Sequence, residues 1–254
     1  MSPVHELRKR PRAILSIDIG GSKCKMLLSG QNEPRRFESG RSLTPLVMVE
    51  RVKELTAGWD YDVVSIGYPG LVGPNGPLSE PGNLGGGWVG FDFPAAFGVP
   101  VRMMNDAAMQ ALGGYEGGRM LFLGLGTGVG SALILDNTIV AIELGELPFN
   151  SKRRFSDVLG RRALDKYGKK PWLAAVDRVV LTLTKAFVVD YVVIGGGNAR
   201  KLRILPPGAR LGHNLTAFRG GFRLWNVEDV KNLGETEGEH LPPLPTPNVD
   251  WRLV

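Results

Sequence analysis

The segment that most constrains this chain runs from Ala13 to Leu28, where two short apolar runs flank a turn containing Asp18, Gly20, Gly21 and Ser22. Two strand-length apolar runs around glycines predict a β-hairpin. The glycines let backbone N–H groups approach an anion without a Cβ in the way, and Ser22 adds a hydroxyl donor. Asp18 is placed to hold Mg²⁺ directly or through water. A tight hairpin turn explains the glycines equally well, so this motif alone leaves phosphate binding open.

Two more glycine-rich loops follow strand-like runs further along the chain. The run 120–125 leads into Gly126, Thr127 and Gly128 before a second apolar run, so the hairpin pattern repeats, with Thr127 in the place of Ser22. The run 191–194 leads into three glycines that we expect to open a helix beside a nucleotide. Three transitions from strand to glycine in one chain favour phosphate binding over ordinary turns.

Between the two predicted hairpins, the apolar run 101–104 ends in Asn105 and Asp106 as a helix begins. A carboxylate at the carboxyl end of a strand can face a ligand site and accept a proton. Asn-Asp before Ala-Ala is also a good helix start, and the local sequence by itself does not distinguish a cap from a catalytic group.

With these residues in this order, the chain resembles the ROK family of sugar kinases, and within it the polyphosphate glucokinase branch. The resemblance covers nearly the whole chain. It rests on the segments Asp18 to Ser22, Gly67 to Val72, Asn83 to Trp88, Asn105-Asp106, Gly126 to Gly128, Glu143 to Gly145 and Gly195 to Gly197. It implies an α/β protein of the actin-like (ribonuclease H-like) ATPase fold, with two lobes around a central cleft that holds the active site.

The resemblance also implies a function: transfer of a phosphoryl group from ATP or polyphosphate to a hexose hydroxyl, with Mg²⁺ present. It makes Asp106 the catalytic base and Asp18 the metal residue. The remaining implied sites are phosphate binding by Gly20, Gly21, Ser22, Gly126, Thr127 and Gly128, nucleotide binding by Gly195, Gly196 and Gly197, and substrate binding by Asn83, Asn105, Asp106, Glu143 and Glu146.

The chain departs from the family pattern in two places. Most relatives have Glu-x-x-His where this chain has Glu143-Leu-Gly-Glu146, which leaves the sugar open. Glu146 either faces the site and raises the pKa of a neighbouring acid or turns outward, and Glu143 itself is either a sugar ligand or a surface acid. Many relatives carry a Cys-rich zinc knot, whereas this chain has one Cys and three His, so we expect no zinc.

Charge is unevenly distributed in this chain of formal net charge +6. Residues 152–170 hold eight Lys or Arg against two acids, and the segment between Asp190 and Glu228 holds six Lys or Arg and no acid. Such basic zones attract polyphosphate or a nucleotide, or are simply solvated helix faces. No nucleic-acid-binding module and no membrane-length apolar run are recognisable, so we expect neither partner.

The single Cys, Cys24, fits a reducing cytoplasm, and we expect a homodimer. We divide the chain into a charged tail (1–12), an N-terminal lobe (13–117), a C-terminal lobe (118–225) and a Pro-rich tail (226–254). The similarity of the two hairpins suggests a duplicated half. The predicted elements are strands at 13–18, 24–29, 35–38, 63–66, 120–125, 131–142 and 191–194, and helices at 45–57, 107–113, 155–167 and 172–187.

Two alternative functions remain. Some ROK members are transcriptional repressors, so a non-catalytic sugar or phosphate sensor is possible, although only about a dozen residues precede the first predicted strand. Glu146 also makes a kinase for a non-hexose acceptor plausible.

Overall fold

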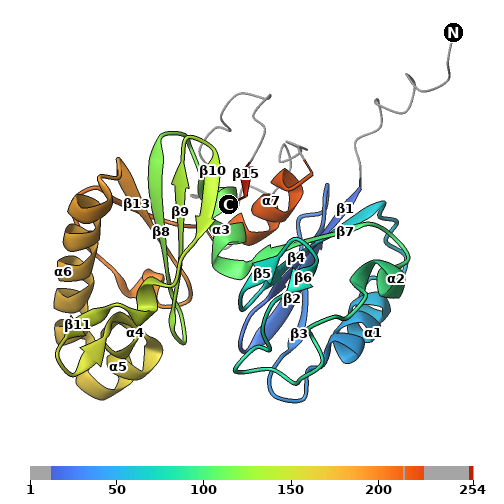
Figure 1. Ribbon diagram of the computed structural model, residues 1–254, viewed down its shortest axis with the longest axis horizontal. Helices are drawn as coiled ribbons and strands as arrows, with labels where there is room; N and C mark the ends of the chain where they lie inside the picture. The colour runs from blue at the N-terminus through green and yellow to red at the C-terminus, as the bar shows by residue number, and fades with distance from the viewer. Residues whose placement is uncertain (1–12, 214, 226–251, 254) are drawn as a thin grey trace, which may run out of the picture.

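The computed structural model describes residues 13–213, 215–225 and 252–253, and its strands form two main sheets, one in each half of the chain (Figure 1). The first sheet has the order β3-β2-β1-β4-β7. Strands β1 to β3 form an antiparallel meander, and β4 and β7 run parallel to β1. Its strands are β1 (Ile14–Ile19), β2 (Lys23–Leu28), β3 (Arg35–Glu38), β4 (Val63–Tyr68) and β7 (Val101–Asn105).

The second sheet repeats this topology, with the order β14-β13-β8-β9-β10-β15. Here β8 to β10 form the meander, β13 and β14 run parallel to β8, and β15 is added beside β10. The strands are β8 (Arg119–Leu125), β9 (Val129–Leu135), β10 (Thr138–Ala141), β13 (Tyr191–Gly195), β14 (Ala209–Leu211) and β15 (Arg252–Leu253). The matching order of strands supports the duplication suggested by the two hairpins.

Strand alternation gives the first sheet two different faces. Leu15, Ile17 and Ile19 point to one face, where they form a core with residues of α1 (Pro45–Leu55) and α2 (Phe93–Phe97). Ser16 and Asp18 point to the opposite face, toward the second half of the chain. The polar residues of β1 therefore lie on the side where the two halves meet.

Two helices cross between the sheets, α3 (Asp106–Gly114) and α7 (Thr216–Arg223) (Figure 1). Helix α3 follows the first sheet in sequence yet packs on β8 and β9, whereas α7 follows β14 of the second sheet and packs on β1 and β4. The helices touch at glycines: a Cβ on Gly113 would lie 1.7 Å from the carbonyl oxygen of Thr216. Each sheet is therefore covered on this side by a helix from the other half of the chain.

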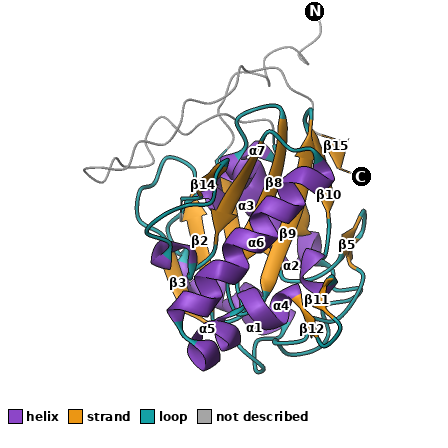
Figure 2. Cartoon of the chain, turned by 90° about the vertical axis from the view of Figure 1, so that its left-hand side faces the viewer, coloured by secondary structure: helices purple, strands orange, loops and turns teal. Residues whose placement is uncertain are grey.

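Three helices cover the outer face of the second sheet: α4 (Phe155–Leu159), α5 (Arg161–Tyr167) and α6 (Lys169–Phe187). Figure 2 shows α6 running across β8 and β9. The small elements are β5 (Val72–Gly73), β6 (Gly76–Pro77), β11 (Pro148–Asn150), β12 (Arg153–Arg154) and the 3₁₀ turns η2 (Leu144–Glu146) and η3 (Ala199–Lys201). No helix among the described residues is long and apolar enough to cross a membrane.

Both predicted hairpins are confirmed, and several predicted boundaries are wrong. The predicted strand 131–142 is split by a turn at Asp136 and Asn137, which both have positive φ. The predicted helix 155–167 is interrupted at Gly160. Gly195 ends β13, and the glycines Gly196 and Gly197 lead into the short 3₁₀ turn η3 and not into an α-helix. Apart from β15, the two predicted tails lie outside the described residues.

Candidate active site

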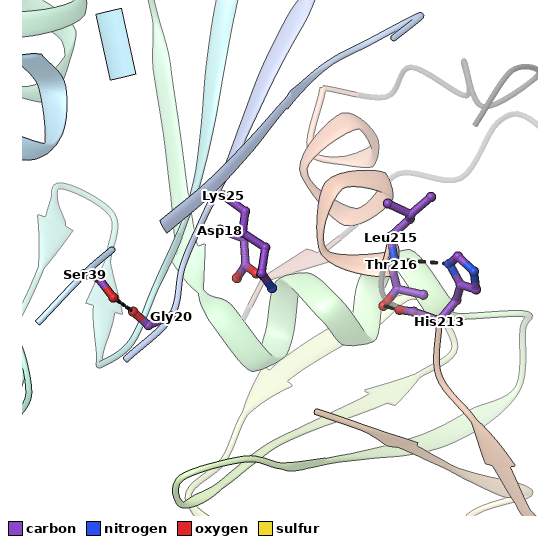
Figure 3. Close-up of polar contacts among 7 residues, drawn as sticks. All are labelled: Asp18, Gly20, Lys25, Ser39, His213, Leu215 and Thr216. Atoms are coloured by element: carbon purple, nitrogen blue, oxygen red, sulfur yellow. Dashed lines mark hydrogen bonds and ion pairs between the residues drawn. The ribbon is translucent and has the colours of Figure 1, made fainter. Parts of the chain in front are cut away.

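The turn between β1 and β2 is held in shape by its own backbone and by Ser39. The N–H of Gly20 donates to the carbonyl of Lys23 at 3.0 Å, and the Ser39 hydroxyl donates to the carbonyl of Gly20 at 2.6 Å (Figure 3). A Cβ on Gly21 would lie 2.4 Å from Nδ2 of Asn83. Glycine at position 21 leaves room for the Asn83 amide beside the turn, and Ser22 remains exposed at the tip of the turn.

Asp18 and Lys25 face each other across the β1–β2 hairpin (Figure 3). Nζ of Lys25 lies 3.4 Å from Oδ2 of Asp18. The Asp18 side chain is 7% exposed and that of Lys25 is 42% exposed. Burial raises the pKa of Asp18, and the charge of Lys25 opposes that rise.

Asp106 is the first residue of α3, and Asn105 is the residue that caps this helix. Oδ1 of Asn105 accepts from the N–H of Ala108 at 3.1 Å, and its Nδ2 donates to the carbonyl of Gly70 at 3.1 Å. Asp106 accepts a hydrogen bond from the N–H of Ala107. The capping role that the sequence left open for Asp106 therefore belongs to Asn105.

The carboxylates of Asp18 and Asp106 are brought together through Gly67. Gly67 pairs with Asp18 in the sheet, and a Cβ at this position would lie 3.4 Å from Cα of Asp106. Removal from water raises the pKa of Asp106 to about 7, and the charges of Asp18 and Glu143 add to this effect. Asp106 is therefore a carboxyl group that changes protonation close to neutral pH.

The β8–β9 hairpin places its glycine loop next to α3. The N–H of Gly126 donates to the carbonyl of Gly128 at 3.1 Å, and Nδ2 of Asn198 donates to the carbonyl of Gly126 at 3.1 Å. Thr127 and Gly128 remain exposed. A Cβ on Gly130 would lie 2.9 Å from Cβ of Ala107, so this hairpin lies against the first turn of α3, beside Asp106.

The glycines after β13 pack against the same loop. Gly196 has φ +82°, and a Cβ on it would lie 2.6 Å from the carbonyl oxygen of Leu125. The N–H of Asn198 donates to that carbonyl at 2.9 Å. Gly195 is buried, whereas Gly196 and Gly197 are exposed. The second and third glycine loops thus form one continuous surface.

Glu143 is positioned by the buried Ser131 of β9. The Ser131 hydroxyl donates to the carbonyl of Ile142 at 2.6 Å and accepts from the N–H of Leu144 at 3.0 Å. Both glutamates are exposed, and Glu146 forms an ion pair with Arg154. Partial burial and the charge of Glu146 raise the pKa of Glu143. Glu146 thus points outward to Arg154 and still lies close enough for its charge to raise the pKa of Glu143, so the structure combines features of the two alternatives.

Trp88, the last residue of the segment Asn83 to Trp88, lies in the core. Its side chain is buried against Tyr68 and Phe93, and its Nε1 donates to the carbonyl of Gly85 at 2.7 Å.

A cavity of about 430 Å³ lies apart from the candidate site, among α4, α5, α6 and the β11–β12 hairpin. None of the predicted site residues lines it.

Asp18 fits the role of a residue that binds Mg²⁺, directly or through water. Mg²⁺ in phosphoryl-transfer sites keeps several waters and takes one or two carboxylates together with phosphate oxygens. Within the described residues no three or more His, Cys, Asp or Glu side chains form a group able to hold a metal. A single buried carboxylate beside a glycine turn matches a metal that is held largely by water and phosphate.

Three residues of this region were missed by sequence reasoning: Lys25, Ser39 and Ser131. Lys25 could have been found from the register of the predicted hairpin, because the residue opposite Asp18 shares its face of the sheet. Ser131 is a polar residue at the start of an otherwise apolar strand. No signal in the sequence pointed to Ser39.

Comparison with known proteins identifies the family of this chain. The model of the ROK family matches residues 14–145, just over half of the chain, and the chain belongs to the ROK family. Polyphosphate glucokinase of Mycobacterium tuberculosis (strain CDC 1551 / Oshkosh) is 28% identical over 209 residues, which cover 73% of this chain and 77% of that protein. The corresponding enzyme of Mycobacterium leprae (strain TN) is also 28% identical, over 73% of this chain and 63% of its own length.

Solved structures show the same fold. The inorganic polyphosphate/ATP-glucomannokinase of Arthrobacter sp. strain KM matches with a TM-score of 0.70 and 23% identity, over 84% of this chain and 98% of that one. A ROK family glucokinase from Streptomyces griseus, solved with glucose and AMPPNP, matches with a TM-score of 0.64 and 16% identity, over 84% and 98% of the two chains. The chain therefore has the two-lobed, actin-like α/β fold expected from the sequence.

Proposed function

We propose that this protein is a sugar kinase that transfers a phosphoryl group from ATP or polyphosphate to a hexose hydroxyl, with glucose the first candidate. The observation that carries this proposal is the meeting of Asp18 and Asp106 beside two glycine hairpins, one from each half of the chain. Family membership and relatives that bear the names polyphosphate glucokinase and polyphosphate/ATP-glucomannokinase support it.

Asp106 acts in this proposal as the general base. It takes the proton of the attacking sugar hydroxyl as that oxygen bonds to the phosphorus and the donor's bridging oxygen leaves. A pKa of about 7 suits this task, because a base is most effective when its pKa lies near the working pH. Asn105 holds the helix start that aims Asp106, through its bonds to Ala108 and Gly70.

The two hairpin turns hold the transferred group. Backbone N–H groups of the glycine turns and the exposed hydroxyls of Ser22 and Thr127 are the available donors on the two sides. Asp18 would hold Mg²⁺, directly or through water, and the ion would neutralise charge on the donor phosphates. In phosphoryl transfer the protein contributes chiefly this positioning and charge neutralisation.

The sugar would lie between Asn83, Asn105 and Glu143. Asn83 extends beside the first glycine turn, and Glu143 follows β10 with its pKa raised by partial burial and by Glu146. Glu146, paired with Arg154 on the surface, would influence the sugar through Glu143 and not by direct contact. A hydrogen bond from a sugar hydroxyl to the Glu143 carboxylate is the contact that this geometry favours.

The donor would extend along Gly195, Gly196 and Gly197, which lie against the second glycine loop. The exposed backbone of Gly196 and Gly197 can approach a nucleotide closely.

The proposal also includes a cytoplasmic location and a homodimer. The buried free thiol of Cys24 is consistent with a reducing compartment.

A product assay tests the function directly. Purified protein is incubated with Mg²⁺, a panel of hexoses and polyols, and either ATP or polyphosphate, and phosphorylated sugar is measured. We expect a hexose phosphate with at least one donor. Sugar binding without a phosphorylated product from any donor would instead favour the non-catalytic sensor, and a product from a polyol alone would favour the non-hexose kinase.

A further inference from the structure

The cavity of about 430 Å³ in the second half of the chain has no role in the proposed function. It lies among α4, α5, α6 and the β11–β12 hairpin, on the outer face of the second sheet (Figure 1). Its volume falls within the range of pockets that hold small organic molecules, about 300 to 1,000 Å³. Space is therefore available for a ligand other than the sugar and the phosphoryl donor.

Most of the cavity lining is apolar or aromatic, and part of it belongs to the core of the second half. Val158, Ala163 and Trp172 line the cavity and are buried in that core. Nε1 of Trp172 donates to the carbonyl of Leu159 at 2.8 Å, so the indole has no further donor to offer. These side chains present apolar surface, which binds the apolar part of a ligand by removing it from water.

Two arginines give the cavity its charge: Arg153 from β12 and Arg178 from α6. Their guanidinium groups lie over the ring of Phe149, 5.9 Å and 4.8 Å from its centroid. The lining holds no Asp or Glu. Among the residues that the structure describes, no carboxylate lies within ion-pair distance of either arginine. The cavity thus combines an apolar wall with two cations that no described acid neutralises.

This combination selects a ligand by both of its properties. A guanidinium that stacks on an aromatic ring keeps the N–H donors at its edge, and their fork matches the two oxygens of a carboxylate. A neutral sugar has no charge for the arginines, and inorganic polyphosphate has no apolar part for the wall. A molecule with one carboxylate and an apolar body satisfies both features.

We propose that the cavity is a binding site for an amphiphilic carboxylate, whose anionic head pairs with Arg153 and Arg178 and whose apolar body lies against Val158 and Trp172. This site goes beyond the proposed function and is separate from the candidate active site. Its test therefore needs no turnover, and failure of the kinase function would leave it standing.

The first part of the test compares probes by ligand-observed NMR titration of the full chain. Octanoate carries both features, octanamide keeps the apolar body without the charge, and acetate keeps the head without the body. We expect octanoate to bind about 10-fold or more tightly than octanamide, because its carboxylate gains charge-assisted hydrogen bonds. It should bind about 100-fold or more tightly than acetate, which buries much less apolar surface. Inorganic tripolyphosphate should not displace octanoate.

The second part compares variants on α6. Arg178→Gln should weaken octanoate binding about 10-fold and leave octanamide binding within about two-fold of the parent. Lys185→Gln is its matched control, because Lys185 is an exposed cation on the same helix that does not line the cavity.

A second pair of α6 variants tests the space itself. Ala174→Phe, at an exposed residue that lines the cavity, should fill it and abolish binding of both octanoate and octanamide. Ala186→Phe, at an exposed residue of α6 outside the lining, should leave binding unchanged. Melting temperatures check that each variant is folded, and Arg178→Gln carries the test by itself if Ala174→Phe does not fold.

Four results would overturn the proposal. Equal Kd values for octanoate and octanamide would remove the role of the charge, and octanoate binding that survives Arg178→Gln undiminished would place the ligand elsewhere. Displacement of octanoate by tripolyphosphate would make the arginines a phosphate site. A change of oligomeric state in Ala174→Phe, measured by analytical ultracentrifugation, would show that a second copy of the chain covers the cavity.

Discussion

Asp106 is an ionisable side chain that the fold removes from water, which disfavours its charged form. It carries an ionisable carboxyl in a place where removal from water and the charge of Asp18 raise its pKa to about 7. A residue with only a structural role gains nothing from such a position, whereas a general base gains a proton affinity matched to its task.

The pKa of Asp106 predicts the pH dependence of turnover. The base must be ionised to accept the hydroxyl proton, so kcat/KM for the sugar should rise about 10-fold per pH unit below pH 7 and level off above it. A pH–rate profile between pH 5.5 and 9 measures this. A profile that stays flat down to pH 5.5 would mean that Asp106 has an ordinary pKa or is not the base.

The same pKa predicts an opposite trend in stability. Because the folded protein raises the pKa of Asp106 from 3.8 to about 7, the folded state holds this proton more tightly than the unfolded chain does. Between about pH 4 and pH 7 the contribution of Asp106 to stability therefore falls as the pH rises. Asp106→Asn should melt at a higher temperature than the parent at pH 8, with the difference vanishing near pH 4. An equal or lower melting temperature of the variant at pH 8 would contradict this.

At the residue level, the sequence was enough to single out Asp18 and Asp106 but not Lys25 or Ser131. The first two stand at the ends of apolar runs beside glycines or Asn105, where local sequence is informative. Lys25 and Ser131 act through partners in neighbouring strands or loops, and those contacts depend on register and tertiary packing.

At the level of elements, the two hairpins were predictable and α7 was not. Each hairpin has two apolar runs around glycines, a pattern that forms locally. Helix α7 contains Gly220 and Gly221 within its eight residues, and glycine disfavours a helix by about 1 kcal/mol relative to alanine. It is a helix because Phe218 and Phe222 pack against Ile14 and Leu27 of the first sheet, a long-range contact that no local pattern reveals.

The crossing of α3 and α7 predicts a sharp contrast between two adjacent glycines. A Cβ on Gly113 would lie 1.7 Å from the carbonyl oxygen of Thr216, whereas a Cβ on Gly114 would meet Cγ2 of Thr216 at 3.7 Å, an ordinary contact. Gly113→Ala should lower the free energy of unfolding by about 1 to 3 kcal/mol or more, because the helices must move apart. Gly114→Ala should be neutral or slightly stabilising.

Chemical denaturation of the two variants measures this contrast. Equal unfolding free energies for Gly113→Ala and Gly114→Ala would show that the helices do not cross as closely as the structure indicates.

In the whole molecule, the candidate site exists only where the two halves meet. Asp18 and the first glycine turn come from the first sheet, and the second and third glycine loops come from the second. Two close contacts bring these parts together: Gly67 lies against Asp106, and Gly130 lies against Ala107. Sequence reasoning from the residues found the parts, and the family resemblance supplied their assembly, because distances between segments so far apart in the chain depend on tertiary packing.

The basic zone at residues 152–170 gives a prediction about the choice of phosphoryl donor. Arg154 is paired with Glu146 and Arg153 lies over the rings of Phe149 and Tyr167, so this part of the zone is partly engaged with the protein itself. We expect neutralising Lys152, Arg153 and Arg154 together to weaken long-chain polyphosphate binding about 3- to 10-fold at low salt, with little effect on ATP.

Titration with labelled polyphosphate at low and physiological salt measures this effect. The control neutralises Arg51 and Lys53, two exposed cations on α1, and should leave polyphosphate binding unchanged. No binding of polyphosphate at either salt concentration would leave the zone as a solvated surface and ATP as the donor.

The most direct test of phosphoryl transfer at this site is a comparison of turnover and sugar binding in Asp106→Asn. The asparagine keeps the size of the side chain and its bond to the N–H of Ala107 but cannot accept the hydroxyl proton at neutral pH. We predict a loss of kcat of about 10²- to 10⁴-fold, the usual contribution of a positioned base, with the glucose Kd within a few-fold of the parent. Comparable kcat values in variant and parent would contradict the assignment of Asp106 and the placement of the chemistry at this junction.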